Sequence, residues 1–322
     1  MEPVNELHNP RSPAGSMSTF FATLSRTFMG ASLDVKEFVP EGVKVRDIWA
    51  EDEDLAEKFR EQIQPTKMEV VKGLDEAMAG MKGEVEHLSD LEKHCKTLSE
   101  IKIPALLKFV ADSKKFMADQ RKAYNKYEDV DIPNAVKEIQ QLCDDLDNHR
   151  YLNGPTQFRS NSGRYVQQVK NTLNAKSFNR RAKETIFKVK VTHSHPVKLT
   201  MKADPGYVLA KSGKSVLDRK RDFTFTELAN AQNEFLVIFI DEKTVCFRTE
   251  HELWFSADAD GNMEQSGNLD EHQKFNCDAF FERRTKLIEQ IEKRIKQFRD
   301  DGLAFIPKVL EVKSRKRHGS AF

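Results

Sequence analysis

Cysteine is scarce in this chain of 322 residues, and its spacing is uninformative for metal or disulfide chemistry. Cys95, Cys143, Cys246 and Cys277 lie far apart and form no Cys-x-x-Cys pair. A disulfide framework is therefore not indicated, and we expect reduced thiols in an intracellular protein. Cys95 and Cys143 fall on apolar helix faces, where a buried and unreactive thiol is the usual state.

The chain also lacks a long apolar stretch. Its densest apolar run, Phe235–Ile240, is far shorter than the roughly 20 residues that a bilayer-spanning helix needs. The opening residues show neither the basic nor the apolar region of a secretory signal. We expect a soluble, cytoplasmic protein, or a nuclear one, because the tail at 306–322 carries the basic cluster Lys313–His318.

Motifs for catalysis, metal binding and nucleotide binding are missing as well. Gly213-Lys214-Ser215 has the wrong distance to the preceding glycine, Gly206, for a phosphate-binding loop. Asp258–Leu269 lacks the glycine and glutamate positions of a calcium loop. His193 and His195 have no third ligand in the sequence. The sequence therefore predicts no catalytic residue, no cofactor and no metal, and it favours a binding protein over an enzyme.

Acidic residues are nearly absent from the middle of the chain. Residues 150–221 hold 17 Lys and Arg against three acids, a net charge of +14. The stretches on either side are acidic, with 7 basic and 14 acidic residues in 51–100 and 2 against 11 in 222–270. A field this concentrated attracts polyanions or acidic protein surfaces. The alternative is that the acidic stretches neutralise the basic segment within the molecule.

Six basic side chains in this segment are the predicted anion contacts, and aromatic residues stand among them. Clustered Lys and Arg beside Phe158, Tyr165 and Phe178 suit a phosphate backbone with stacked bases, or anionic lipid headgroups. We expect contacts with phosphates and not readout of base edges. The predicted residues are Arg159, Arg164, Arg180, Arg181, Lys188 and Lys190.

Residues 50–182 are predicted to form a helical, coiled-coil-like domain. A first helix is expected to end near Pro65, because proline disfavours helix in the residue before it. Apolar residues from Val70 to Leu98 follow the 4-3-4 spacing of a and d positions over about four heptads. Further helices are predicted over 104–127 and, after a proline turn at 131–133, up to the Asn-Gly-Pro at 153–155. Three antiparallel helices joined in this way make a bundle or an elongated coiled-coil rod.

The apolar period changes from that of a helix to that of a strand at Glu184. Before it, 156–182 is polar and basic, with one short helix predicted at Tyr165–Leu173. After it, Phe187–Met201 alternates apolar residues with lysines around His193–Pro196, which predicts a hairpin with one lysine face. No repeat of 20–50 residues is visible. A loop is expected at 258–267, and further strands are predicted at 223–226, 235–240, 245–248 and 253–255.

The N-terminal residues 1–49 are predicted to be disordered and to carry short linear motifs. Within them, 17–30 has Phe20, Phe21, Leu24 and Phe28 on one helical face. We expect this segment to dock in a groove of the protein or of a partner, with a membrane interface as the alternative.

One N-terminal peptide is similar to a known interaction motif. Glu37-Phe38-Val39-Pro40 matches the end of the short peptide by which translation regulators bind the C-terminal domain of poly(A)-binding protein, so Leu33–Pro40 resembles that motif. The motif has a leucine seven residues before the phenylalanine, where this chain has Ala31. The resemblance implies a peptide motif at Glu37, Phe38 and Pro40 and nothing further about function.

Together these patterns predict an α+β protein with a disordered N-terminus, a helical region, a small β-rich unit at 183–276, a C-terminal helix at 277–305 and a basic tail. The predicted function is that of a non-enzymatic binding or scaffold protein. It would hold an anionic partner, with nucleic acid favoured, on 150–221, and it would self-associate through its helices. The alternatives are a membrane-surface coiled-coil dimer that binds anionic lipid and an adaptor with protein partners only.

Overall fold

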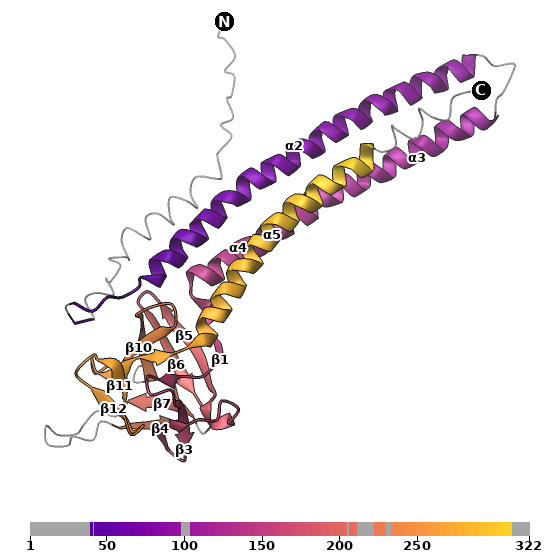
Figure 1. Ribbon diagram of the computed structural model, residues 1–322. Helices are drawn as coiled ribbons and strands as arrows, with labels where there is room; N and C mark the ends of the chain where they lie inside the picture. The colour runs from indigo at the N-terminus through magenta and orange to yellow at the C-terminus, as the bar shows by residue number, and fades with distance from the viewer. Residues whose placement is uncertain are drawn as a thin grey trace, which may run out of the picture.

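The computed structural model places a β-rich head at one end of a long helical arm (Figure 1). It describes residues 39–40, 42–97, 104–204, 206–210, 222–229 and 233–310. The predicted helix at 17–30, the motif residues Glu37 and Phe38, and tail residues 311–322 lie outside these ranges; Pro40 is exposed. The mixture of helix and strand that the sequence predicts is confirmed.

The arm consists of long helices that lie side by side. Helix α2 contacts each of the other three, and α4 also contacts α5. On α2, Val70, Leu74, Ala77 and Met81 are buried, so the first part of the predicted apolar stripe faces its neighbours, whereas Leu91 is exposed. The helices are α2 (Ile48–Thr97), α3 (Pro104–Lys126), α4 (Ile132–Asp147) and α5 (Asp278–Leu310).

Helix α2 does not end near Pro65, so that prediction is wrong. Pro65 lies inside the helix, where a missing N–H and a steric clash typically cost about 3 kcal/mol. The Thr66 hydroxyl donates a hydrogen bond to the Gln62 carbonyl at 2.7 Å, and Ile63 and Val70 are buried on either side of the proline. Packing of this face against α4 and α5 keeps the helix continuous, since tertiary contacts supply most helical stability in proteins.

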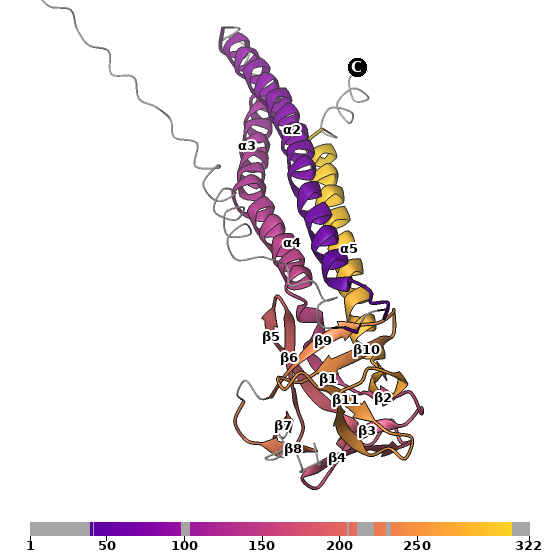
Figure 2. The same ribbon diagram turned by 90° about the vertical axis from the view of Figure 1, so that its left-hand side faces the viewer.

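The predicted proline turn between the second and third helices is also wrong. A π-helical turn, η2 (Tyr127–Asp131), joins α3 to α4 without reversing the chain (Figures 1 and 2). Asp131 keeps a helical backbone and makes no side-chain cap, while Pro133 stands in the first turn of α4, where its missing N–H is tolerated. The arm is therefore not the predicted bundle of three turn-linked helices: α3 and α4 together run back along α2.

The head is built from antiparallel strands that belong to one curled sheet. Within the described residues the strands are β1 (Gly154–Thr156), β2 (Arg159–Ser160), β3 (Tyr165–Val169), β4 (Thr172–Ser177), β5 (Phe187–Ser194), β6 (Val197–Lys202), β7 (Tyr207–Ala210), β8 (Phe223–Thr226), β9 (Glu234–Phe239), β10 (Thr244–Arg248), β11 (Trp254–Ala257), β12 (Met263–Ser266) and β13 (Phe275–Asn276).

The order of strand pairing returns to its starting point. Strands β1 and β2 belong to one run of chain, 154–160, and this run pairs with β5 through β1 and with β13 through β2. Between those two strands the order is β5-β6-β9-β10-β13. Segment 154–160 therefore lies between β5 and β13, so the order of strands around the curled sheet returns to its start.

Three units of similar topology make up this sheet: unit one (154–194), unit two (197–239) and unit three (244–276). In each, the first strand pairs with the fourth and the second pairs with the third as a hairpin, while the fourth pairs with the first strand of the next unit. Strands β4, β8 and β12, one from each hairpin, contact one another. This is the arrangement of a β-trefoil, and it is a repeat that the sequence analysis missed.

Strands begin well before the predicted boundary at residue 183. The predicted helix at Tyr165–Leu173 is wrong, because these residues belong to β3 and β4. The buried Val166, Leu173 and Ala175 are separated by polar residues, and the Gln167 amide donates to Asn174 at 2.9 Å across the hairpin. The predicted hairpin is confirmed as β5–β6, and the further predicted strands are confirmed as β8 to β11. The predicted loop at 258–267 is wrong in part, since β12 lies within it.

Phenylalanine fills the head. The largest buried side chains of the sheet are almost all Phe, and their rings form edge-to-face and tilted pairs such as Phe158–Phe247 at 5.2 Å and Phe223–Phe255 at 4.6 Å. Such pairs add about 0.5–1.5 kcal/mol beyond burial of apolar area. Phenylalanine therefore supplies the largest side chains of this core.

The helical arm covers the end of the head opposite the β3–β4 and β7–β8 hairpins (Figure 2). The buried residues of the arm and of the head belong to one continuous hydrophobic cluster. At the connection, the Arg283 guanidinium on α5 donates to the carbonyls of Tyr151, Leu152 and Pro155 at 2.6–3.0 Å. Since these carbonyls lie just before and within β1, the bonds attach α5 to the start of the sheet.

The contact between units one and three gives a test of the fold. Gly261 and Gly163 both have positive φ, +79° and +80°, but a Cβ on Gly261 would lie 2.4 Å from the Ala175 carbonyl oxygen, while one on Gly163 meets nothing within 4 Å. We expect Gly163→Ala to lower the free energy of unfolding by about 1–2 kcal/mol, and Gly261→Ala to lower it by about 1–3 kcal/mol more. Urea unfolding measures both; equal losses would contradict this placement of the β11–β12 turn.

Candidate anion-binding surface

The six predicted anion contacts all belong to unit one of the head. Arg180, Arg181, Lys188 and Lys190 are exposed, and Arg159 and Arg164 are half-buried. They come from β2, from the turns that flank the β3–β4 hairpin, and from β5. Because the predicted polar linker is folded into the sheet, these side chains are held by a rigid scaffold.

Two of the six line a pocket of about 150 Å³. Arg159 reaches it from β2 and Arg180 from the turn after β4; we call it the Arg159–Arg180 pocket. The side chain of Gln157 positions the second arginine, since its amide donates to the Arg180 carbonyl and to the Thr185 hydroxyl, both at 2.6 Å. The other lining residues are Pro155, Thr156, Tyr165, Ile186, Asn276, Asp278 and Ala279.

A row of exposed side chains leads from this pocket along β5. Ile186, which lines the pocket, and then Lys188 and Lys190 alternate with the buried residues of the strand, so all three lie on its outer face. Lys202 on β6 stands directly opposite Lys188. Like charges in directly opposed positions destabilise a sheet, so the fold itself does not require this pair.

An exposed aromatic ring stands beside the arginines. Phe178 keeps 75% of its surface exposed, and the Arg164 guanidinium lies over its ring at 5.4 Å from the centroid. Arg180 and Arg181 follow in the next turn, where the Asn179 side chain accepts a hydrogen bond from the backbone N–H of Arg181. A cation and a free ring face at one place suit a planar, negatively charged ligand.

Internal neutralisation of these charges is not seen. Among the described residues, no ion pair involves any of the six predicted side chains. The acids of α2 pair with bases of the arm and its connection, for example Glu69 with Arg299 at 3.2 Å and Asp52 with Arg284 at 2.5 Å. Within the described residues, the acids of α2 therefore do not neutralise these six side chains.

Charge is divided unevenly among the three units. Unit one has nine Lys and Arg against one acid, a net of +8, and unit three has two against seven, a net of −5. Unit two lies between them, with seven against five. Of the +14 carried by residues 150–221, unit one therefore holds +8.

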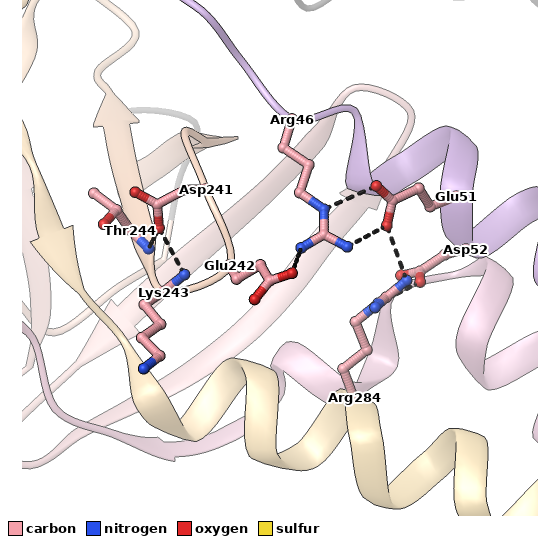
Figure 3. Close-up of polar contacts among 8 residues, drawn as sticks. All are labelled: Arg46, Glu51, Asp52, Asp241, Glu242, Lys243, Thr244 and Arg284. Atoms are coloured by element: carbon pink, nitrogen blue, oxygen red, sulfur yellow. Dashed lines mark hydrogen bonds and ion pairs between the residues drawn. The ribbon is translucent and has the colours of Figure 1, made fainter.

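A polar network that the sequence did not predict lies at the joint between arm and head (Figure 3). Arg46 makes a bidentate pair with Glu51 at 2.7 and 2.8 Å and also reaches Glu242, at 3.4 Å, in the β9–β10 turn. Arg284 of α5 bonds Asp52 and lies 3.5 Å from Glu51. The hydrogen bond from Arg46 holds the pKa of Glu51 below its ordinary value. No sequence motif marks this network, because its members come from four separate elements.

Next to this network lies a fully buried polar cluster. Asp52 and His149 have no exposed surface, and the His149 Nδ1 is 3.5 Å from an Asp52 carboxylate oxygen. Burial, followed by the Asp52 charge, raises the pKa of Tyr151 well above its ordinary value, so its hydroxyl stays neutral. Trp49 covers the imidazole at a ring distance of 4.5 Å. Because Asp52 and His149 are fully buried, the cluster is part of the packed joint between arm and head and is not open to a ligand.

Other kinds of site are not seen in the described part of the chain. There, no group of three or more His, Cys, Asp or Glu side chains is placed to hold a metal ion. Burial raises the pKa of the Cys143 thiol to about 11 and that of Cys246 to about 12, which keeps both protonated. None of the described helices has an apolar stretch long enough to cross a bilayer.

Comparison with known proteins leaves the site to be judged on its own geometry. No known protein family matches the chain. No curated protein matches it either.

The joint gives a second testable prediction. Arg284→Ala leaves the buried Asp52 carboxylate without its arginine and should lower the free energy of unfolding by about 3–5 kcal/mol. Glu242→Ala, in the same network but at a side chain that is 81% exposed, should cost at most about 1 kcal/mol. The double variant Asp52→Ala/Arg284→Ala should recover most of the loss, because no buried charge remains. Urea denaturation measures all three, and equal losses for the two single variants would contradict the role given to Arg284.

Proposed function

We propose that this protein is a non-enzymatic binding protein that holds single-stranded nucleic acid on unit one of its head. The main supporting observation is that the six basic side chains lie in one unit of the sheet. Among the described residues, they form no ion pair with the protein's own carboxylates. A cationic surface of this kind attracts a phosphate backbone over long range and releases its counterions on contact.

The aromatic side chain in the surface favours nucleic acid over lipid. Phe178 offers a ring face to stacking at the point where Arg164, Arg180 and Arg181 gather. Stacking on an exposed ring contributes about 1–3 kcal/mol per base and is tolerant of sequence, because every base has a π-face. Phosphate contacts by lysine and arginine likewise carry no base information. We therefore propose binding without a strong sequence preference.

The arm is proposed to supply self-association. Beyond the end of α5, α2 and α3 continue alone in the described part of the arm (Figure 1). Exposed apolar side chains on these two helices include Val85, Leu91, Leu107 and Phe116. Coiled-coil pairing of two arms through such residues would bring two heads onto one strand, which raises avidity without any new contact in the head.

The salt dependence of binding tests the proposal. Lys188→Ala/Lys190→Ala should weaken binding of a single-stranded oligonucleotide and reduce the slope of log K against log salt by about 1.4, since each phosphate contact contributes roughly 0.7. The matched control is Lys108→Ala/Lys122→Ala, two exposed lysines of α3, because both variants change the net charge from +1 to −1. Fluorescence anisotropy at several salt concentrations gives the slopes.

Two outcomes of the salt titration would contradict the proposal. One is an equal effect of the two double variants, which would place the contribution in net charge and not in the face of β5. The other is binding to anionic liposomes with none to RNA or DNA, which would favour the membrane-surface alternative.

Phe178 gives a separate prediction about stacking. Phe178→Ala should weaken binding about tenfold or more without changing the salt slope, because a stacked ring neutralises no phosphate. Leu228→Ala is the control, since Leu228 in unit two is equally exposed, at 75%, and apolar. Quenching of a fluorescent base analogue by the wild-type chain, lost in the phenylalanine variant alone, would identify the ring as the stacking partner. A change in salt slope with unchanged quenching would contradict it.

A further inference from the structure

The geometry of the Arg159–Arg180 pocket points to one particular group of the nucleic acid: we propose that the pocket takes the terminal phosphate of the strand. This inference rests on the proposed function and goes further, because it distinguishes a strand end from the strand interior. The remaining nucleotides then follow the outer face of β5.

The charge of the pocket suits a phosphomonoester. Two guanidinium groups, Arg159 and Arg180, face a single carboxylate, that of Asp278, among the lining residues. A terminal phosphate carries about −1.5 to −2 charges at neutral pH and three acceptor oxygens, whereas an internal phosphodiester carries only one charge. The planar fork of arginine matches phosphate oxygens in pairs, so two arginines can satisfy a monoester that a lysine would meet only as a point charge.

The backbones of Arg159 and Arg180 are fixed by hydrogen bonds, and their guanidinium groups form no ion pair within the described residues. Arg159 lies in β2, paired with Asn276 of β13 on one side and with Tyr165 of β3 on the other. The backbone of Arg180 is anchored by the Gln157 amide. Neither guanidinium forms an ion pair within the described residues, so both remain able to donate to a ligand. Because the two backbones are fixed, only the arginine side chains lose freedom when a ligand binds.

The surroundings of the pocket favour a strand end. On one side it is bounded by Asn276 and by the first turn of α5, represented by Asp278 and Ala279. On the other side Ile186 leads to the lysines of β5. Lys188 and Lys190 lie two residues apart, about 7 Å along the strand, which is close to the spacing of successive phosphates in an extended chain. A strand that follows these lysines therefore reaches the pocket from the Ile186 side, and we assign its terminal phosphate to the pocket.

The test compares oligonucleotides that differ only at their ends. The full chain is titrated by anisotropy with one short single strand that carries a 5′-phosphate, a 3′-phosphate or hydroxyls at both ends. We expect one of the phosphorylated forms to bind about tenfold more tightly than the hydroxyl form, as one additional charge-assisted contact provides.

Three variants locate that preference. Arg180→Ala should abolish the difference between the phosphorylated and hydroxyl forms, and it should also weaken binding of the hydroxyl form, because Arg180 belongs to the proposed binding surface. Asp278→Asn should increase the difference, because it removes the carboxylate that competes with the phosphate. Lys108→Ala on the arm should leave the difference unchanged. Thermal unfolding of each variant confirms that it is folded.

The outcomes separate this inference from the proposed function. Equal affinity for all three oligonucleotides, with a normal salt slope, would overturn the terminal-phosphate site and leave the binding surface standing. A preference that survives Arg180→Ala would also overturn it, since the phosphate would then be bound elsewhere. Failure to bind any of the three would overturn both proposals.

Discussion

The structure depends on one constraint, the pairing of segment 154–160 with both β5 and β13. That segment is the first part of the sheet and β13 is the last, so their pairing brings α4 and α5 out of the head at the same place. The helices then have to run together, and Arg283 fixes them there by donating to carbonyls just before and within β1. Arm and head share one hydrophobic cluster as a consequence, and the joint buries Asp52 completely beside the partly buried Arg284.

The same constraint creates the candidate site. The Arg159–Arg180 pocket exists only because β2 closes the sheet against β13, which places Asn276 and the start of α5 beside residues of unit one. Without closure, Arg159 and Arg180 would stand on an open edge with no wall behind them. The pocket is thus formed by the pairing of β2 with β13, whereas its charge comes from the arginines at positions 159 and 180.

The sequence could predict the parts of the fold whose pattern is local. The β5–β6 hairpin was predictable because apolar residues and lysines alternate there, and α5 because Ile291 and Phe298 keep a helical period. The β3–β4 hairpin was not, because side-chain hydrogen bonds such as Gln167–Asn174 replace apolar contacts on its outer face. The continuity of α2 through Pro65 depends on packing against α4 and α5. The six basic residues were found from charge density alone, but the pocket was not, since Asn276 and Asp278 reach it through long-range pairing.

A pseudo-symmetric head makes the distribution of charge informative. All three units meet the same folding requirement, which is an apolar residue at the inward positions, and each unit contributes at least two fully buried phenylalanines. The outward positions are free of that requirement, so three equivalent units have no structural reason to differ in charge. They differ from +8 in unit one to −5 in unit three. Lys188 opposite Lys202 even places like charges in register, at some cost to the sheet. Local choices that oppose stability concentrate where a protein binds something. The uneven charge therefore supports the proposal that unit one binds the partner, since its arginines and the exposed ring of Phe178 lie together there.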